Sequence, residues 1–188
     1  MGHYRTVLDL SAADDGRRGA FLLAMGKASF QGGALSEAAS AYDAARIWGL
    51  QAGDRMVAVQ AARGMAGVHK AQEESTAART ILEAALTLLG DDRGPQAVRV
   101  LADLADTELL MGKFPEGTAH ARQAFEYSRA LDDPLLEARA CRTLGRLLTR
   151  VNDNAAGIAV LERALALATA ADDRRKRQWS VGGSNLSR

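Results

Sequence analysis

The chain has 188 residues, a formal net charge of +1 and a hydrophobic fraction of 47%. This balance excludes a globally basic nucleic-acid binder and a strongly acidic tail protein. A single cysteine, Cys141, excludes an intramolecular disulfide and suits a reducing compartment. No stretch approaches the roughly 18 uncharged apolar residues of a membrane-spanning helix, and residues 1–10 are too polar for a secretory signal. We therefore expect a cytoplasmic protein without a membrane anchor, and the excess of arginine over lysine is typical of a GC-rich bacterial genome.

In chain order, the pattern predicts eight helices that alternate between the first helix (A) and the second helix (B) of a repeated unit. Residues 1–13 precede them. The A helices are expected at about 14–31, 54–72, 95–111 and 134–150, and the B helices at about 35–49, 75–89, 115–130 and 155–171. Apolar residues within these segments recur at threes and fours, and no segment alternates as a strand does. The sequence therefore predicts an all-α protein.

Aspartates mark the expected starts of the A helices. A carboxylate at the N-cap accepts hydrogen bonds from the free N–H groups of the first helical turn, and Asp14, Asp54, Asp133 and Asp173 can each fill this role. Pro134 follows its aspartate at the position where a missing N–H costs nothing. Capping explains these carboxylates, so we expect no catalysis from them.

Small residues recur in three columns with a step of about forty residues. The columns are Gly26, Ala66, Ala105 and Gly145; then Ala38, Ala78, Gly117 and Gly157; then Ala45, Ala85, Ala124 and Ala164. Only Gly or Ala lets two helix backbones approach closely, so the columns predict the places where paired helices cross. They divide the chain into four repeats, 14–53, 54–93, 94–132 and 133–173, followed by a basic cap or disordered tail at 174–188.

These columns resemble the tetratricopeptide repeat, in which a Leu-Gly/Ala pair in the first helix precedes small, large and small residues in the second. The second-helix pattern here reads Ala38-x3-Tyr42-x2-Ala45, Ala78-x3-Leu82-x2-Ala85, Gly117-x3-Ala121-x2-Ala124 and Gly157-x3-Leu161-x2-Ala164. The step is longer than the common unit of thirty-four residues and is similar to the forty-residue variant of bacterial regulators and signalling proteins. The resemblance covers about residues 14–173 and implies a right-handed α-solenoid of four helix-turn-helix repeats.

Four arginines share one face of the fourth A helix, because they lie three or four residues apart: Arg139, Arg142, Arg146 and Arg150. The resemblance implies that A helices line a concave groove. Earlier A helices carry Lys27, Arg63, Lys70 and Arg99, and Asp106 is the one acidic residue expected among these basic residues.

Like charges at this spacing repel one another, so the basic face indicates an anionic partner, with a merely solvated helix face as the open alternative. Guanidinium groups favour carboxylates and phosphates through paired hydrogen bonds. We therefore predict a peptide-binding set of Lys27, Arg63, Lys70, Arg99, Arg139, Arg142 and Arg146.

Other chemistry-bearing residues show no functional pattern. His3, His69 and His120 have no partner at a metal-binding spacing. Cys141 lies on an apolar helical stripe, which favours a buried, unreactive thiol. We expect no metal, no cofactor and no enzymatic activity.

The two tryptophans are expected in structural roles. Trp48 shares a B-helix column with Leu88, Tyr127 and Leu167 and is predicted to be a core residue. Trp179 follows the basic run 174–177 and is predicted to anchor the end of the stack, with a disordered tail or a nucleic-acid contact as alternatives for this segment.

The sequence thus predicts a non-enzymatic scaffold that captures an acidic peptide segment of another protein in a basic groove. The alternative is a peptide- or metabolite-sensing effector module of a bacterial transcriptional regulator. Neither a membrane nor a nucleic-acid partner is expected, and the oligomeric state is left open.

Overall fold

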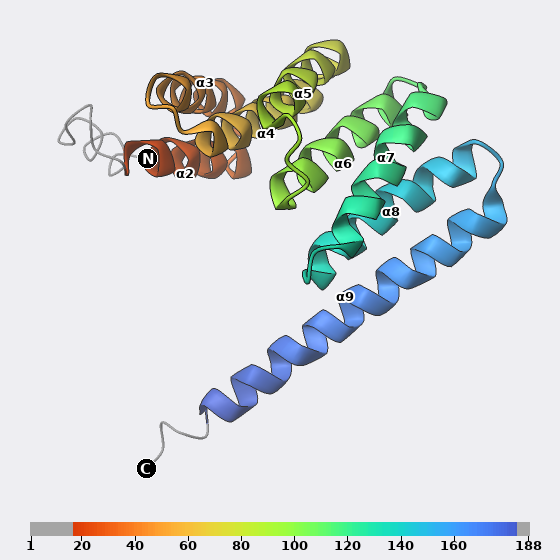
Figure 1. The fold of residues 1–188 in the computed structure, drawn as a ribbon. Helices are drawn as coiled ribbons and strands as arrows, with labels where there is room; N and C mark the ends of the chain where they lie inside the picture. Colours follow the sequence, from red (N-terminus) through yellow and green to blue (C-terminus); the bar gives the residue numbers. More distant parts are fainter. Residues whose placement is uncertain (1–16, 184–188) are drawn as a thin grey trace. The chain divides into compact units, whose positions relative to one another are not determined.

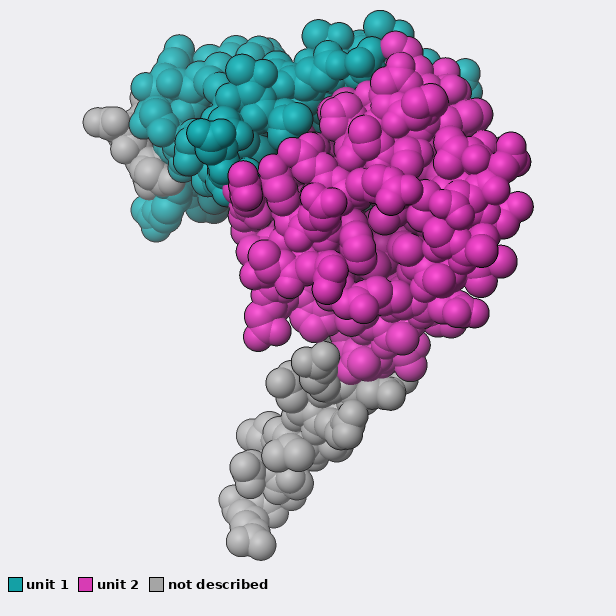
Figure 2. Space-filling model, turned by 45° about the vertical axis from the view of Figure 1, so that its right-hand side comes forward, with its two compact units in different colours: residues 1–92 teal, residues 93–188 magenta. Residues whose placement is uncertain are grey.

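The computed structural model describes residues 17–183, which form eight helices and no strand (Figure 1). The chain divides into two compact units, Met1–Asp92 and Arg93–Arg188. Figure 2 shows them in separate colours. The division falls one residue before position 94, where the sequence places the start of the third repeat, and each unit contains two helix-turn-helix repeats.

In each unit the helices pack in chain order, and the two A helices also contact each other. The first unit contains α2 (Arg18–Gln31), α3 (Leu35–Gln51), α4 (Arg55–Ala71) and α5 (Ser75–Leu89). The second contains α6 (Pro95–Leu110), α7 (Phe114–Arg129), α8 (Pro134–Arg150) and α9 (Asn154–Gly183). Helices α2, α4, α6 and α8 are the A helices, and the predicted all-α repeat architecture is confirmed.

Capping fixes where two of the A helices begin. The Asp54 carboxylate accepts from the Val57 N–H at 3.0 Å, and Asp133 accepts from the N–H groups of Leu135 and Leu136 at 3.1 and 3.0 Å. Asp14 lies outside the described residues. The predicted caps at 54 and 133 are therefore confirmed.

The turn between the helices of each repeat uses one residue in the left-handed region. These residues are Gly33, Glu73, Gly112 and Asn152, with φ of 76°, 63°, 72° and 63°. They form a further column with the step of the repeat. The second turn lacks a glycine or asparagine, and Glu73 adopts the conformation instead, which an L-residue does only at an energetic cost.

Helix α9 is longer than predicted. The sequence places its end near residue 171 and a new helix after Asp173, but α9 continues as one helix to Gly183. No Gly or Pro stands between residues 158 and 181, so nothing interrupts the helix before the Gly182-Gly183 pair. Residues 174–183 are thus a continuation of α9, and the side chain of Trp179 lies outside the part of the structure described.

The small columns lie where paired helices cross. A Cβ atom on Gly145 would lie 2.6 Å from Leu161 Cγ and 3.0 Å from the carbonyl oxygen of Gly157. One on Gly117 would lie 3.3 Å from the carbonyl oxygen of Ala105. The steric role predicted for these columns is confirmed in the second unit.

Aromatic rings fill the equivalent space in the first unit. The Tyr42 ring fits against both Gly26 of α2 and Gly64 of α4, where added Cβ atoms would lie 2.7 and 2.3 Å from it. Trp48 covers Gly19 and packs against the buried cluster around Leu22, which confirms its predicted place in the core.

Candidate functional site

The predicted basic residues are divided between the two units. Lys27 of α2 is exposed, and Arg63 and Lys70 of α4 are half-buried in the first unit. The remaining four lie on the A helices of the second unit: Arg99 on α6, and Arg139, Arg142 and Arg146 on α8. Because α6 and α8 contact each other, the second unit brings several of the predicted residues into one region.

Two of the α8 arginines form ion pairs with acidic residues of α6, one repeat earlier. Arg139 pairs with Asp103, and Arg146 Nη1 lies 3.1 Å from Asp106 Oδ1. Asp103 is a buried acidic residue, with a side chain 11% exposed. The expectation that Asp106 is the one acidic residue among these arginines is therefore wrong. The two pairs join adjacent A helices and offset part of the charge of the basic face.

Other arginines of this face keep their charge uncompensated by a neighbouring carboxylate. Arg142 and Arg150 are exposed, and neither forms an ion pair with another residue among those described. Arg146 also keeps about half of its side chain exposed, at 49%, despite its pair with Asp106. These guanidinium groups remain accessible to an anionic ligand.

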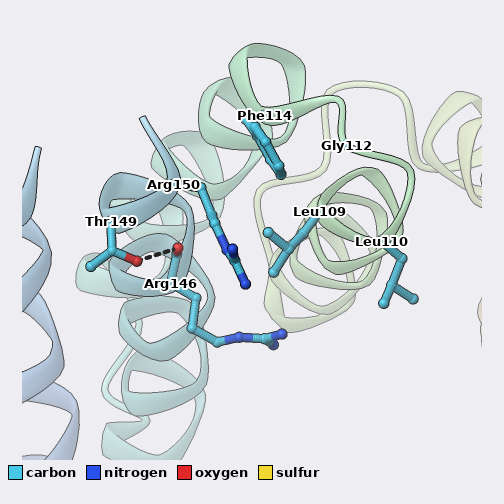
Figure 3. A pocket seen from close by; sticks show the side chains of 7 residues that line it. All are labelled: Leu109, Leu110, Gly112, Phe114, Arg146, Thr149 and Arg150. Atoms are coloured by element: carbon cyan, nitrogen blue, oxygen red, sulfur yellow. Dashed lines mark hydrogen bonds between the residues drawn. The ribbon is translucent and has the colours of Figure 1, made fainter. Parts of the chain in front are cut away.

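A pocket of about 480 Å³ lies between the C-terminal ends of α6 and α8 and the start of α7 (Figure 3). From α8, the side chains of Arg146 and Arg150 extend into it. Leu109 and Phe114 form an apolar wall on the opposite side. The complete lining is Leu109, Leu110, Gly112, Phe114, Arg146, Thr149 and Arg150.

The pocket combines two kinds of contact. Two guanidinium groups can each hold a carboxylate or phosphate through parallel hydrogen bonds. Leu110 is 64% exposed at the rim and offers apolar surface beside these charges. Thr149, also in the lining, donates from its Oγ1 to the Arg146 carbonyl oxygen at 2.8 Å. The geometry therefore suits an acidic group with an apolar neighbour.

Only Arg146 of the predicted binding set lines this pocket. Arg139 and Arg142 instead line a second groove, between α8 and α9. Sequence reasoning placed Arg150 on the basic face but omitted it from the set, and it did not assign Leu109, Leu110 and Phe114 to a site. The sequence signal that could have found them is the Leu109-Leu110 pair at the end of an A helix, shortly before the Gly112 turn.

The remaining chemistry-bearing residues take part in structural contacts. Burial and the nearby Glu137 carboxylate raise the pKa of the Cys141 thiol to about 11, which makes the thiolate scarce. His120 Nδ1 lies 2.8 Å from Oε2 of the buried Glu108, and His69 Nδ1 lies 2.6 Å from Glu74 Oε2. Within the described residues, no group of three or more His, Cys, Asp and Glu side chains is arranged to hold a metal ion.

Comparisons with known proteins give the fold. No protein-family model matches the sequence, and no curated protein matches it. Among solved structures, BtubC from P. vanneervenii is similar at 16% identity and a TM-score of 0.76, over 91% of this chain and 72% of that chain. The apo form of RapI is similar at 12% identity and a TM-score of 0.79, over 94% of this chain and 65% of that chain.

A third similar structure, kinesin light chain TPR-like repeats from Podosopora anserina, has 14% identity and a TM-score of 0.66 over 89% of this chain and 85% of that chain. The chain therefore has an all-α, TPR-like repeat fold, as its residue columns predicted. At these identities the likeness defines the fold, and the site must be interpreted from its own residues.

Proposed function

We propose that this chain is a non-enzymatic interaction module that binds an acidic segment of another protein in the pocket between α6 and α8. The observation that carries the proposal is the pair of arginines, Arg146 and Arg150, facing an apolar wall across an open pocket. Acidic side chains of the segment would bind the guanidinium groups, and a neighbouring apolar side chain would pack against Leu109 and Phe114. The cytoplasm is the compartment we propose.

The charge arrangement supports an acidic rather than a neutral ligand. Arg146 already donates a hydrogen bond to Asp106. A bound carboxylate would therefore compete with Asp106 or accept from the remaining N–H groups of the guanidinium. Arg150 has no such competitor among the described residues. The stronger contribution to binding is therefore expected from Arg150, which sequence reasoning left out of the set.

The test uses a fluorescent peptide with two glutamates flanked by leucine and phenylalanine, and a second peptide with glutamines in their place. Fluorescence anisotropy should show binding of the glutamate peptide, weaker binding of the glutamine peptide, and weakening of the former as salt rises. The potential of exposed charges is screened over about 8 Å at physiological ionic strength. Equal binding of the two peptides would contradict the proposal.

A matched pair of variants locates the binding. Arg146→Glu with Arg150→Glu should abolish capture of the glutamate peptide. Arg122→Glu, on an exposed position of α7 outside the pocket, should leave it unchanged. Arg99, Arg139 and Arg142 stay predicted binding residues, to be tested singly by the same titration.

The alternative function is that of a peptide- or metabolite-sensing effector module of a bacterial transcriptional regulator. It predicts that a ligand changes the conformation of the repeats as well as occupying the pocket. Small-angle scattering of the peptide complex distinguishes the two, because a scaffold keeps its radius of gyration on binding and a sensor does not.

A further inference from the structure

Helices α8 and α9 present an uncovered apolar groove of about 520 Å³, which we call the end face. It contains Leu135 and Arg142 of α8, and Leu161 and Leu165 of α9. Leu135 is 62% exposed and Leu165 is 69% exposed, and Ile158, two turns before Leu165 along α9, is 55% exposed. These are among the most exposed large apolar side chains of the described residues, and Leu135 and Leu165 line the same groove.

In the earlier repeat of the same unit, the corresponding surface of α6 and α7 is covered by the next A helix, α8. Helix α8 packs on both α6 and α7, whereas α9 contacts only α8 among the described helices. As a result, little of the apolar stretch Asn154–Asp172 is buried. By length and composition alone this stretch could also cross a membrane, although it contains Glu162 and Arg163 near its middle.

Two charged residues flank the apolar part of the end face. Arg142 lies two turns from Leu135 along α8, and Glu162 lies one turn from Ile158 and Leu165 along α9. Both are exposed, and neither forms an ion pair with another described residue. The chain runs in opposite directions in α8 and α9, because Gly145 crosses Gly157 and Arg163 pairs with Glu137. In this register Arg142 lies within about one helical turn of the level of Glu162, which the long arginine side chain can span.

This arrangement is self-complementary. A two-fold rotation about an axis parallel to the helices exchanges the α8 side of the face with the α9 side. It therefore places Arg142 of one copy opposite Glu162 of the other, twice per pair. Closed two-fold association of identical patches is the commonest form of homo-oligomer, and in it a contact of one residue with another occurs twice.

We propose that the end face binds a second copy of this chain, with α9 of each copy packed against α8 of the other. Leu165 enters the other copy's groove beside Leu135, and the Arg142–Glu162 pairs fix the register. The contact removes the exposed leucines Leu135 and Leu165 from water, which supplies the driving force. The pocket between α6 and α8 is not part of this contact, although Arg139 and Arg142 of the predicted peptide-binding set line the end face.

Sedimentation equilibrium of the full chain tests the oligomeric state. The unaltered chain should be a dimer in the micromolar range. Leu165→Glu and Leu135→Glu should each give a monomer with unchanged helicity by circular dichroism, because each buries a charge in the contact. Leu110→Glu, an equally exposed leucine outside the end face, should remain a dimer.

A charge exchange tests the register. Arg142→Glu and Glu162→Arg should each weaken the dimer by about tenfold or more, since like charges then face each other. The double variant should restore the affinity, because the opposite charges are again paired. A double variant as weak as the single ones overturns the proposed arrangement.

Two further results would overturn the proposal outright. One is an unaltered chain that stays monomeric throughout the micromolar range, and the other is a dimer that persists in both Leu165→Glu and Leu135→Glu. Flotation with phosphatidylcholine–phosphatidylglycerol vesicles is run in parallel. A monomeric chain that floats with the vesicles assigns the end face to a lipid surface and rejects the dimer.

Discussion

Gly145 of α8 lies directly against Leu161 of α9, and no space for a side chain exists between them: an added Cβ would lie 2.6 Å from Leu161 Cγ. The carbonyl oxygen of Gly157 closes the same space from another side, at 3.0 Å. The last repeat is therefore held by a contact that only glycine permits, and the stability of the second unit should depend on it.

Gly145→Leu should lower the free energy of unfolding by about 1–3 kcal/mol, because overpacking forces α8 and α9 apart. Urea denaturation followed by circular dichroism measures the change. The matched comparison is Gly145→Ala with Gly67→Ala in α4, where an added Cβ meets only Phe30, at 3.8 Å. Alanine there should be neutral or stabilise the helix by about 0.5–1 kcal/mol. Equal effects at both positions would contradict the steric interpretation.

Asp103→Ala should cost about 1–3 kcal/mol of stability, because it removes the buried partner of Arg139. Asp106→Ala removes the partner of Arg146, which is about half exposed, and should cost less than about 1 kcal/mol. Thermal and urea denaturation should therefore show a larger loss of stability for Asp103→Ala than for Asp106→Ala. The opposite order would mean that burial does not determine the strength of these pairs.

Cys141 should make stability depend on alkaline pH. Its pKa is raised from 9.0 to about 11 in the folded chain, so the folded state keeps the thiol proton where the unfolded state loses it. The stability from this site is complete below pH 9 and falls as the pH rises from about 9 to 11. Burial also raises the pKa of Tyr42, so the comparison must be made between variants.

The measurement is urea denaturation of the unaltered chain and of Cys141→Ala at pH 8 and pH 10.5. The difference in stability between the two proteins should be smaller at the higher pH. An unchanged difference would show that the thiol ionises alike in both states.

The fold followed from the sequence because each repeat crossing needs a small residue at a fixed place. Ala105 and Gly117 lie at such a crossing, and their columns were visible without a structure. The length of α9 was missed because Asp173 fits an N-cap, whereas the segment around it contains no residue that ends a helix. A cap residue permits a helix start but does not enforce one.

The site was predicted only in part, because its contacts join different helices. Spacing within one helix shows which arginines share a face, but the partners of those arginines lie on another helix. Asp103 reaches Arg139 across thirty-six positions of sequence, and no local pattern reveals that pair. The apolar wall formed by Phe114 likewise depends on how the Gly112 turn directs the start of α7 toward α8.

The central claim, that an acidic segment binds between α6 and α8, is tested most directly by nuclear magnetic resonance during titration with the glutamate peptide. The methyl signals of Leu109 and Leu110, the ring signals of Phe114 and the Nε–H signals of Arg146 and Arg150 should shift together and saturate, whereas the glutamine peptide should leave them nearly unchanged. Shifts that gather instead on the B helices, or that are the same for both peptides, would contradict the account.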